Sequence, residues 1–235
     1  MRFPKIHGVI RRRLLVNFRL DPEVAQRQLP APFRPKLHAG YAVAGICLIR
    51  LEEIRPKRFP KLLGVSSENA AHRFAVQWTD ADGEHEGVYI PRRDSGSLLN
   101  RLAGGRVFPG EHHRATFDVI DTGHQVSITM RSADDAVTVR VDATAARELA
   151  PDSIFDSVSK ASSFFEPGSL GYSATTSGKL DGVVLQTKRW EVHPLRVASV
   201  SSSYFEDESR FPKGSVEFDC ALIMRDIEHE WHAVP

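Results

Sequence analysis

The densest group of side chains with acid–base or metal-binding chemistry is the run Glu111-His112-His113. Imidazole and carboxylate groups bind transition metals, and imidazole moves protons near neutral pH. If the run begins a strand, Glu111 and His113 share one face about 6–7 Å apart, and His112 faces the other way. Two ligands do not complete a metal site, and the sequence offers no evident third ligand. The pattern therefore favours a polar strand end over a metal centre, and residues 229–232 (HEWH) are a weaker candidate.

Signatures of several large enzyme classes are absent from the sequence. It contains no Gly-x-Gly-x-x-Gly run, no Walker loop, no Gly-x-Ser-x-Gly elbow and no His-Glu-x-x-His pair. Dinucleotide, nucleotide, α/β-hydrolase and zincin functions thus have no support. Lys plus Arg exceed Asp plus Glu by 31 − 30 = +1. No excess of positive charge favours nucleic acid or anionic lipid, so neither is an expected partner.

The two cysteines, Cys47 and Cys220, lie far apart in the sequence, each in an apolar stretch. Cysteines in such surroundings are most often buried free thiols, which is the favoured interpretation. A disulfide between them and a nucleophilic role remain alternatives.

The start of the chain does not read as a complete secretion signal. Residues 1–5 resemble the charged start of one, but Arg11-Arg12-Arg13 interrupts the place where roughly 7–15 apolar residues should follow. The longest apolar run, residues 41–49, is about half the length that crosses a bilayer. These features predict a cytoplasmic protein without a membrane partner.

Apolar residues recur mostly at every second position, which predicts a chain dominated by strands. The residues Asp80-Ala81-Asp82-Gly83 predict a hairpin turn between two of them. The expected strands span residues 14–20, 41–51, 72–79, 86–90, 114–120, 125–131, 137–143, 183–192 and 195–205, and residues 215–225 are also strand-like.

Short helices are expected between the strands, at residues 22–28, 95–103 and 153–165. Asp21 is placed to cap the first, with Pro22 at its first position. No repeat, low-complexity tract or linker is evident. The sequence therefore predicts a single α+β domain over residues 1–235, mainly of antiparallel strands.

Several phrases of the sequence resemble acetoacetate decarboxylase-like proteins. Residues 11–22 (RRRLLVNFRLDP), 64–68 (GVSSE) and 94–109 follow one another in that family's order. One branch, of bacterial proteins of unknown function on the same barrel, carries phrases similar to residues 161–173 (ASSFFEPGSLGYS), 202–205 (SSYF) and 211–219 (FPKGSVEFD). The resemblance covers most of the chain and implies an acetoacetate decarboxylase-like β-barrel with a few short helices.

The resemblance breaks at the position of the family's chemistry. In the decarboxylase, the reacting lysine follows a proline and precedes a second lysine, which helps to keep the first amine neutral for Schiff-base formation. The matching positions here are Pro109-Gly110-Glu111, so the amine is missing and the neighbour's charge is reversed. The resemblance therefore implies a protein without lysine Schiff-base chemistry, and no cofactor is expected.

The resemblance implies that two polar positions of the family are retained. Arg11 matches the barrel arginine and would hold a carboxylate or carbonyl oxygen, while Glu68 matches a pocket glutamate that would move a proton. Alternatively the two form an ion pair that closes a barrel end; both interpretations place them close together. His112 or His113, beside the lost lysine, would supply a base, and at most one of them faces the interior.

Arg92, Arg93 and Tyr172 complete the candidate site. The run Arg92-Arg93-Asp94 precedes an expected helix and is either an exposed charge cluster or a contact for an anionic ligand, with neither arginine better placed. Tyr172 either lines the cavity or packs in the core.

These observations predict a cytoplasmic barrel protein that binds a small acidic or carbonyl-containing molecule. Because the decarboxylases assemble, the resemblance also implies a homo-oligomer of no particular size. The alternatives are a lyase or hydrolase that uses Glu68 with His112 or His113, and a scaffold whose cavity is filled by its own side chains.

Overall fold

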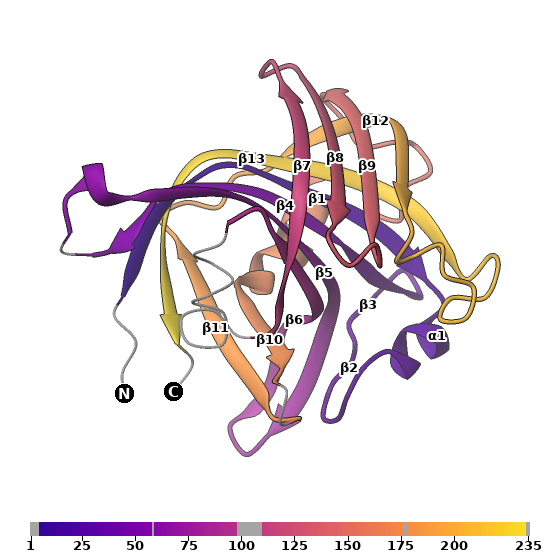
Figure 1. Ribbon diagram of the computed structural model, residues 1–235. Coiled ribbons are helices and arrows are strands. Elements are labelled where there is room, and N and C mark those ends of the chain that lie inside the picture. Colours follow the sequence, from indigo (N-terminus) through magenta and orange to yellow (C-terminus); the bar gives the residue numbers. More distant parts are fainter. Residues whose placement is uncertain (1–4, 58, 98–109, 176–177, 234–235) are drawn as a thin grey trace.

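The computed structural model describes residues 5–57, 59–97, 110–175 and 178–233. The protein is built mainly from strands (Figure 1). The strands are β1 (Ile6–Leu20), β2 (Arg34–Pro35), β3 (Leu37–His38), β4 (Tyr41–Pro56), β5 (Val65–Asp80), β6 (Gly83–Ser95), β7 (His112–Asp121), β8 (Gln125–Ser132), β9 (Thr138–Ala145), β10 (Leu170–Ala174), β11 (Leu180–Thr187), β12 (His193–Ser202) and β13 (Val216–Ala233). The helical elements are α1 (Pro22–Arg27), α3 (Val158–Phe165) and the 3-10 turns η1 (Lys61–Leu63) and η2 (Glu166–Ser169).

Pairing between the strands closes the sheet into two rings. The continuous order is β11-β10-β6-β7-β8-β9-β12-β13-β1-β4-β5-β2, and further pairings join β11 to β13 and β5 to β6. The smaller ring is therefore β11-β10-β6-β5-β4-β1-β13. The larger ring follows β6-β7-β8-β9-β12-β13-β1-β4-β5, and in Figure 1 its strands β7, β8 and β9 stand across the long shared strands.

Each ring encloses its own apolar cluster, because the shared strands bury both faces. On β1, Leu14 and Val16 belong to the cluster of the larger ring and Leu15 to that of the smaller ring. Phe164 and Phe165 of helix α3 also belong to the smaller ring's cluster, so this helix packs against that ring. The shared strands thus serve as a common wall between two interiors.

Local sequence signals placed the first helix and the main hairpin correctly. Asp21 caps α1, since its Oδ1 accepts hydrogen bonds from the backbone N–H groups of Glu23 (2.8 Å) and Val24 (3.2 Å). The turn after Asp80 joins β5 to β6 with Asp80 opposite Gly83. Both predictions are confirmed.

The other expected helices differ from the prediction or lie outside the described residues. The expected helix 153–165 begins only at Val158, because Asp219 accepts hydrogen bonds from the Ser153 hydroxyl (3.1 Å) and the Ile154 N–H (2.7 Å) and holds the preceding turn. Ser95, expected to begin a helix, ends β6 instead. Most of that expected helix, residues 98–103, lies outside the described residues.

The observed strand boundaries differ most from the expected ones at the ends of the chain and near residue 170. β1 and β13 are longer than expected because they pair with each other from Ile6↔Trp231 to Leu20↔Val216. β10 was not expected, since its sequence (LGYSA) is short and contains glycine and serine. The strand expected at residues 183–192 lies at Leu180–Thr187.

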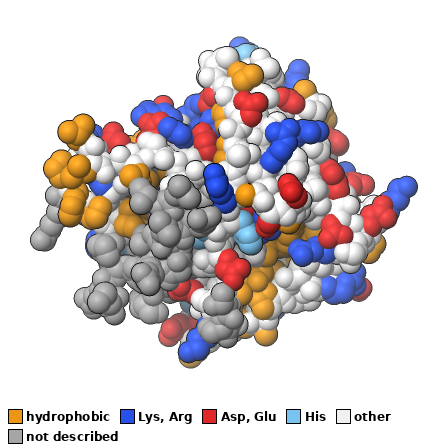
Figure 2. Space-filling view, in the orientation of Figure 1, with side chains coloured by type: hydrophobic (Ala, Val, Ile, Leu, Met, Phe, Trp, Pro, Cys, Tyr) orange, Lys and Arg blue, Asp and Glu red, His pale blue; other side chains and the backbone are white. Residues whose placement is uncertain are grey.

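Exposed apolar side chains gather at the turn between β4 and β5, seen at the left of Figure 2. Phe59, Leu62 and Leu63 are all exposed there, and Leu62 is 94% exposed. No helix within the described residues is long and apolar enough to span a bilayer.

Candidate functional site

A cavity of about 90 Å³ lies inside the smaller ring. Every strand of that ring contributes to its wall, together with Gly168 and Ser169 of η2. One water molecule needs roughly 10–15 Å³ of cavity volume, so the cavity has room for roughly six to nine water-sized groups. Much of the wall is apolar, formed by Ile49, Leu51, Val88, Ile90, Val183, Leu185 and Trp231.

Three arginines project from this apolar wall: Arg13 from β1, Arg73 from β5 and Arg93 from β6. Their Nη1, Nε and Nη2 atoms, respectively, are buried without a hydrogen-bond partner. Other atoms of the three contact neutral groups: Arg13 Nε donates to Cys47 Sγ (3.2 Å), Arg73 Nη2 to Asn17 Oδ1 (2.5 Å) and Arg93 Nε to Ser173 Oγ (3.3 Å).

No carboxylate neutralises these three arginines within the described residues. The one acidic residue among the described wall residues, Asp94, is held by Arg92. The remaining stretches of the chain (residues 1–4, 58, 98–109, 176–177 and 234–235) contain neither Asp nor Glu in their sequences. No acidic side chain of these stretches could therefore neutralise Arg13, Arg73 or Arg93.

Burial makes these charges costly. It lowers the pKa of Arg73 to about 10 and that of Arg93 to about 10, because a guanidinium loses its hydration in an apolar interior. At neutral pH both remain cations. Unpaired buried charges destabilise a fold unless an opposite charge compensates them, so the cavity favours a small anion.

His112 and His113 face opposite ways, as the alternation along a strand requires. His112 is paired in register with Arg93 and lines the cavity. Burial, reinforced by the charges of Arg93 and His113, lowers the pKa of His112 to about 4, so its imidazole is neutral at pH 7. The His113 Nδ1 atom lies 3.2 Å from the Asp134 carboxylate. Of the two histidines, His112 is the one placed to exchange a proton with a cavity ligand.

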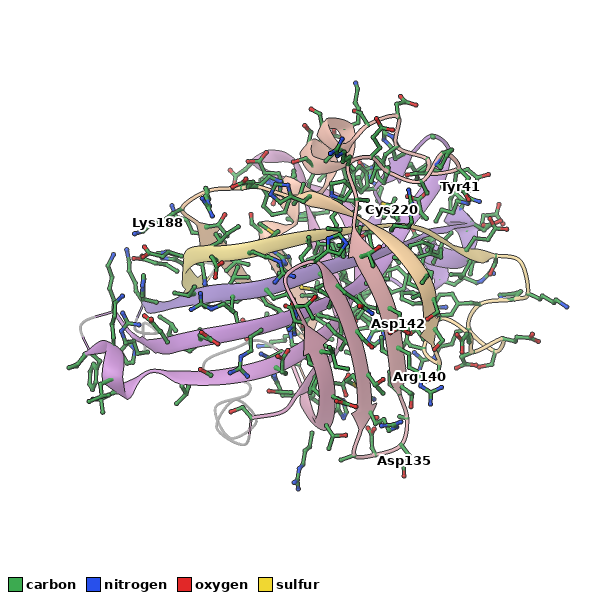
Figure 3. The ribbon with its side chains drawn as sticks, turned by 90° about the horizontal axis from the view of Figure 1, so that it is seen from above. Tyr41, Asp135, Arg140, Asp142, Lys188 and Cys220 are labelled. Carbon is green, nitrogen blue, oxygen red and sulfur yellow. The ribbon has the colours of Figure 1, made fainter. Side chains whose placement is uncertain are left out.

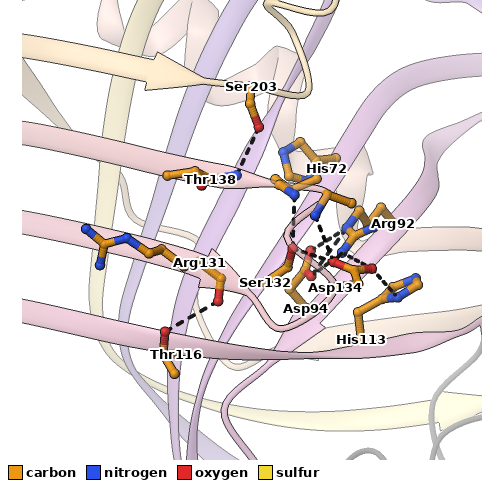
Figure 4. A network of polar contacts seen from close by, with 12 residues as sticks. His72, Arg92, Asp94, His113, Thr116, Arg131, Ser132, Asp134, Thr138 and Ser203 are labelled. Carbon is orange, nitrogen blue, oxygen red and sulfur yellow. Dashed lines mark hydrogen bonds and ion pairs between the residues drawn. The ribbon is translucent and has the colours of Figure 1, made fainter.

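Arg92 belongs to a polar network on the other side of β6 (Figure 4). Its guanidinium donates to both carboxylate oxygens of Asp94 (2.9 and 3.0 Å) and to Asp134 (2.9 Å). Burial raises the pKa of Asp94, and the bonds to Arg92 oppose that rise. Arg92 does not line the arginine-rich cavity, and it forms ion pairs with Asp94 and Asp134.

The expected pair of Arg11 and Glu68 is not formed. Arg11 is exposed and pairs with Glu52 (3.0 Å) and Asp226 (2.5 Å). Its neighbour Arg12 takes the expected position instead, with Nη2 2.7 Å from Glu68 Oε2. The cause is a register shift: Ile10 lies opposite Leu51 and Arg12 opposite Arg50, which leaves Arg11 as the extra residue of a β-bulge.

Glu68 and Tyr172 also lie away from the cavity. Burial raises the pKa of Glu68 while the charge of Arg12 opposes the rise, so the carboxylate is a partner of that arginine. Tyr172 packs against the rings of Phe33 (5.6 Å) and Trp78 (5.4 Å) in the larger ring's cluster. Its neighbour Gly171 lines the cavity, as alternation along β10 requires.

Arg13 and Arg73 were missed by the sequence reasoning. Both are charged residues next to or within apolar runs, and Arg73 falls inside an expected strand. A charged residue on an apolar strand is the signal that would have marked them, since it must find a partner or a ligand in the interior.

Gly110, which takes the lysine position in the family resemblance, has no room for a side chain. Its φ is 82°, and a Cβ there would lie 2.6 Å from Ser173 Cβ and 3.8 Å from Arg93 Nε. The left-handed backbone and this contact both favour glycine.

The lysines of the chain all fall in the described residues, and none of them lines the arginine-rich cavity. Lys36 is half-buried beside a smaller adjoining cavity, with Nζ 2.6 Å from Glu86 Oε2. The others are exposed, and Lys188 projects from the edge of the molecule in Figure 3. They are Lys5, Lys57, Lys61, Lys160, Lys179, Lys188 and Lys213.

Neither histidine group of the sequence assembles a metal centre. Across the described ranges, no three His, Cys, Asp or Glu residues are grouped so as to hold a metal ion.

Comparison with known proteins gives one family and one fold. The model of the DUF2071 family, described as an uncharacterized conserved protein, matches residues 9–218. No curated protein matches the chain. A known structure similar to the chain is acetoacetate decarboxylase from Legionella pneumophila, with 13% identity, 99% of this chain and 88% of that chain covered, and a TM-score of 0.61.

Two further solved structures share the fold. The enduracididine biosynthesis enzyme MppR complexed with pyruvate has 10% identity, covers 99% of this chain and 89% of its own, and gives a TM-score of 0.60. An acetoacetate decarboxylase-like enzyme from Sphingomonas wittichii RW1 has 12% identity, 100% and 94% coverage and a TM-score of 0.55. These likenesses confirm the decarboxylase-like fold class that the sequence predicted.

Proposed function

The chain belongs to the DUF2071 family, and we propose that its smaller ring binds a small carboxylic acid without lysine Schiff-base chemistry. The observation that carries this proposal is the set of unpartnered donors on Arg13, Arg73 and Arg93 in one apolar cavity. A guanidinium matches a carboxylate in charge and in the spacing of its donors. A bound acid would supply the negative charge that the cavity lacks.

The size and the wall of the cavity restrict the rest of the ligand. Room for roughly six to nine water-sized groups suits a short acid, such as a small oxo or hydroxy acid. The apolar residues around the arginines would cover its carbon atoms. The similar structure of MppR is a complex with pyruvate, which is an acid of this size.

A lysine imine has no support in this cavity. No lysine lines it, and Gly110 cannot accept a side chain without displacing Ser173. A second function, lyase or hydrolase chemistry, is favoured by His112 alone, since its neutral imidazole lines the cavity and can accept a proton. Under that function, His112→Gln would abolish turnover of an acid that it still binds.

Ligand-dependent thermal unfolding tests acid binding. Pyruvate, glyoxylate and lactate should each raise the melting temperature, whereas pyruvamide and lactamide, which lack the charge, should not. Arg73→Met should weaken acid binding by about 1.5–3 kcal/mol, or roughly 10–150-fold in Kd, the value of a charge-assisted hydrogen bond. Arg11→Met removes an exposed arginine and is the matched control; it should bind acids like the wild type.

Two outcomes would contradict the proposal. One is equal stabilisation by the acids and their amides, and the other is unchanged acid binding in Arg73→Met. Borohydride treatment with pyruvate should leave the intact mass unchanged, and a reduced adduct on a lysine would overturn the absence of Schiff-base chemistry.

A further inference from the structure

The arginine-rich cavity also contains a thiol. Cys47 on β4 is a free cysteine, is 7% exposed and lines the cavity wall. Its Sγ accepts a hydrogen bond from Arg13 Nε at 3.2 Å. The sulfur therefore lies next to the same guanidinium whose Nη1 is left without a partner.

Cationic side chains share the cavity wall with Cys47. Arg13 donates a hydrogen bond to its Sγ, and Arg73 and Arg93 line the same cavity. The thiolate is the nucleophilic form of cysteine, and cysteines that act as nucleophiles are found beside cationic groups. The guanidinium groups that would hold a carboxylate therefore line the same cavity as the sulfur.

Cys220 shows the opposite environment. Burial, together with the neighbouring Asp219, raises the pKa of the Cys220 thiol. It does not line the cavity, and Asn17 Nδ2 lies 3.6 Å from its Sγ. This cysteine is a control within the same chain, because it has the same chemistry in a different electrostatic setting.

The two cysteines cannot form a disulfide in this fold. Cys47 lies opposite Leu15, and Cys220 lies opposite Asn17 on the other side of β1. With a whole strand between them, their Cα atoms are separated by at least two strand spacings, about 9.5 Å, whereas a disulfide needs less than about 7 Å. Cys47 is thus available for chemistry with a ligand.

We propose that Cys47 is a nucleophile that adds reversibly to the carbonyl carbon of a small 2-oxo acid whose carboxylate is held by Arg13, Arg73 and Arg93. Sγ loses its proton and forms a bond to the carbonyl carbon. The carbonyl electron pair moves to oxygen, which takes up one proton, and the product is a thiohemiacetal. Nothing is oxidised or reduced, and the reverse step releases the acid.

The inference rests on the proposed function, because the acid must first bind. Geometry supports it: a 2-oxo acid carries its electrophilic carbon directly beside the carboxylate, and Sγ lies within hydrogen-bond distance of Arg13. The Cys47 sulfur would form the covalent bond to the acid in a cavity that no lysine lines.

Alkylation of the native full-length chain tests whether the thiol is directed toward acids. Iodoacetate and iodoacetamide react alike, with an S–C bond formed, iodide released and the thiol proton passed to solvent, but only iodoacetate carries a charge. Rates at Cys47 and Cys220 are read by peptide mass spectrometry, with N-acetylcysteine as the reference thiol. The ratio of the iodoacetate rate to the iodoacetamide rate at Cys47 should exceed the reference ratio by about tenfold or more, as one charge-assisted hydrogen bond provides.

Matched variants and a competitor locate the effect. Arg73→Met and Arg93→Met should each lower the ratio toward the reference, and excess propionate should slow iodoacetate labelling in the wild type, which requires no variant to fold. Cys220 should react only after unfolding. A ratio equal to that of N-acetylcysteine, or no labelling of Cys47 by either reagent, would overturn the proposal.

Carbon-13 NMR with [2-¹³C]pyruvate and [2-¹³C]glyoxylate tests the adduct itself. A new signal from a tetrahedral carbon should appear with the wild type and Cys220→Ser and be absent with Cys47→Ser. If Cys47→Ser keeps the signal, or if no signal forms, Cys47 is not the nucleophile. Thermal shifts by the acids separate the two failures: shifts without an adduct leave the proposed function standing, and the absence of both overturns it as well.

Discussion

Arg92 and Arg93 are adjacent arginines with opposite surroundings. Arg92 is bound by Asp94, whose side chain is fully buried, and by Asp134. Arg93 faces the cavity with Nη2 unpartnered, and its pKa is lowered to about 10 because it is buried. The same side chain is therefore paired with carboxylates at one position and left with an unpartnered donor at the next.

Replacing each of these arginines by methionine should separate the two roles. Arg92→Met leaves the buried Asp94 carboxylate without a counter-charge and should lower the free energy of unfolding by about 3–5 kcal/mol. Arg93→Met removes an uncompensated charge and should leave the ligand-free protein within about 1 kcal/mol of the wild type, or more stable. Urea unfolding without added acids measures both values. Equal destabilisation would mean that Arg93 supports the fold instead of awaiting an anion.

Bulges in two strands decide which arginines reach the cavity. On β6, Val88 and Ile90 line the cavity, and strict alternation would add Arg92 to them. The β5–β6 register runs from His72↔Arg92 to Phe74↔Tyr89, so β6 has an extra residue there and Arg93 faces the cavity instead. The bulge at Arg11 has the same effect on β1 and turns Arg13 inward.

These bulges also mark the limit of what the sequence could predict. The hairpin at Asp80–Gly83 and the cap at Asp21 were predictable because their signals are local. The side of the sheet reached by Arg11, Arg12 or Arg13 was not, because one extra residue reverses every later side chain and depends on pairing with a distant strand. The family resemblance predicted the fold correctly because the order of the strands tolerates a shift of one residue. It misplaced the pair of Arg11 and Glu68 because a single side-chain contact does not tolerate such a shift.

A residue of β13 with left-handed backbone lies beside the bulge at Arg11 and can be tested directly. Asp226, which pairs with Arg11, has a φ of 53°, where glycine is favoured. Asp226→Gly and Asp226→Val both remove the carboxylate, so their difference isolates the backbone. The valine variant should be less stable than the glycine variant by about 1–2 kcal/mol, measured by urea unfolding. Equal stabilities would mean that the strand straightens without cost.

The two rings have different interiors. The larger ring holds an aromatic core in which His72 packs against Tyr204 (4.5 Å) and Phe205 (5.9 Å). The smaller ring keeps a cavity whose wall includes buried cations and His112. Both interiors therefore contain a histidine that folding holds away from water, and protonation of either would oppose the fold.

The stability of the molecule should consequently fall in mild acid. Burial is the main cause that lowers the pKa of His72 to about 3 and the pKa values of His112 and His229 to about 4, each from 6.5. Between pH 6.5 and about 4 the unfolded chain binds protons that the folded chain does not, so the free energy of unfolding decreases as the pH falls, by up to about 1.4 kcal/mol per pH unit for each histidine.

His72→Phe tests this dependence, because it keeps an aromatic ring in the core and removes one titrating group. Urea unfolding at several pH values between 6.5 and 5 should show a slope of stability against pH that is smaller than the wild-type slope by about 1 kcal/mol per pH unit. This window lies above most of the range in which ordinary carboxylates titrate, so the difference belongs to histidine. An unchanged slope would mean that His72 binds its proton equally well in the folded and unfolded chains. Burial in the larger ring would then not lower its pKa.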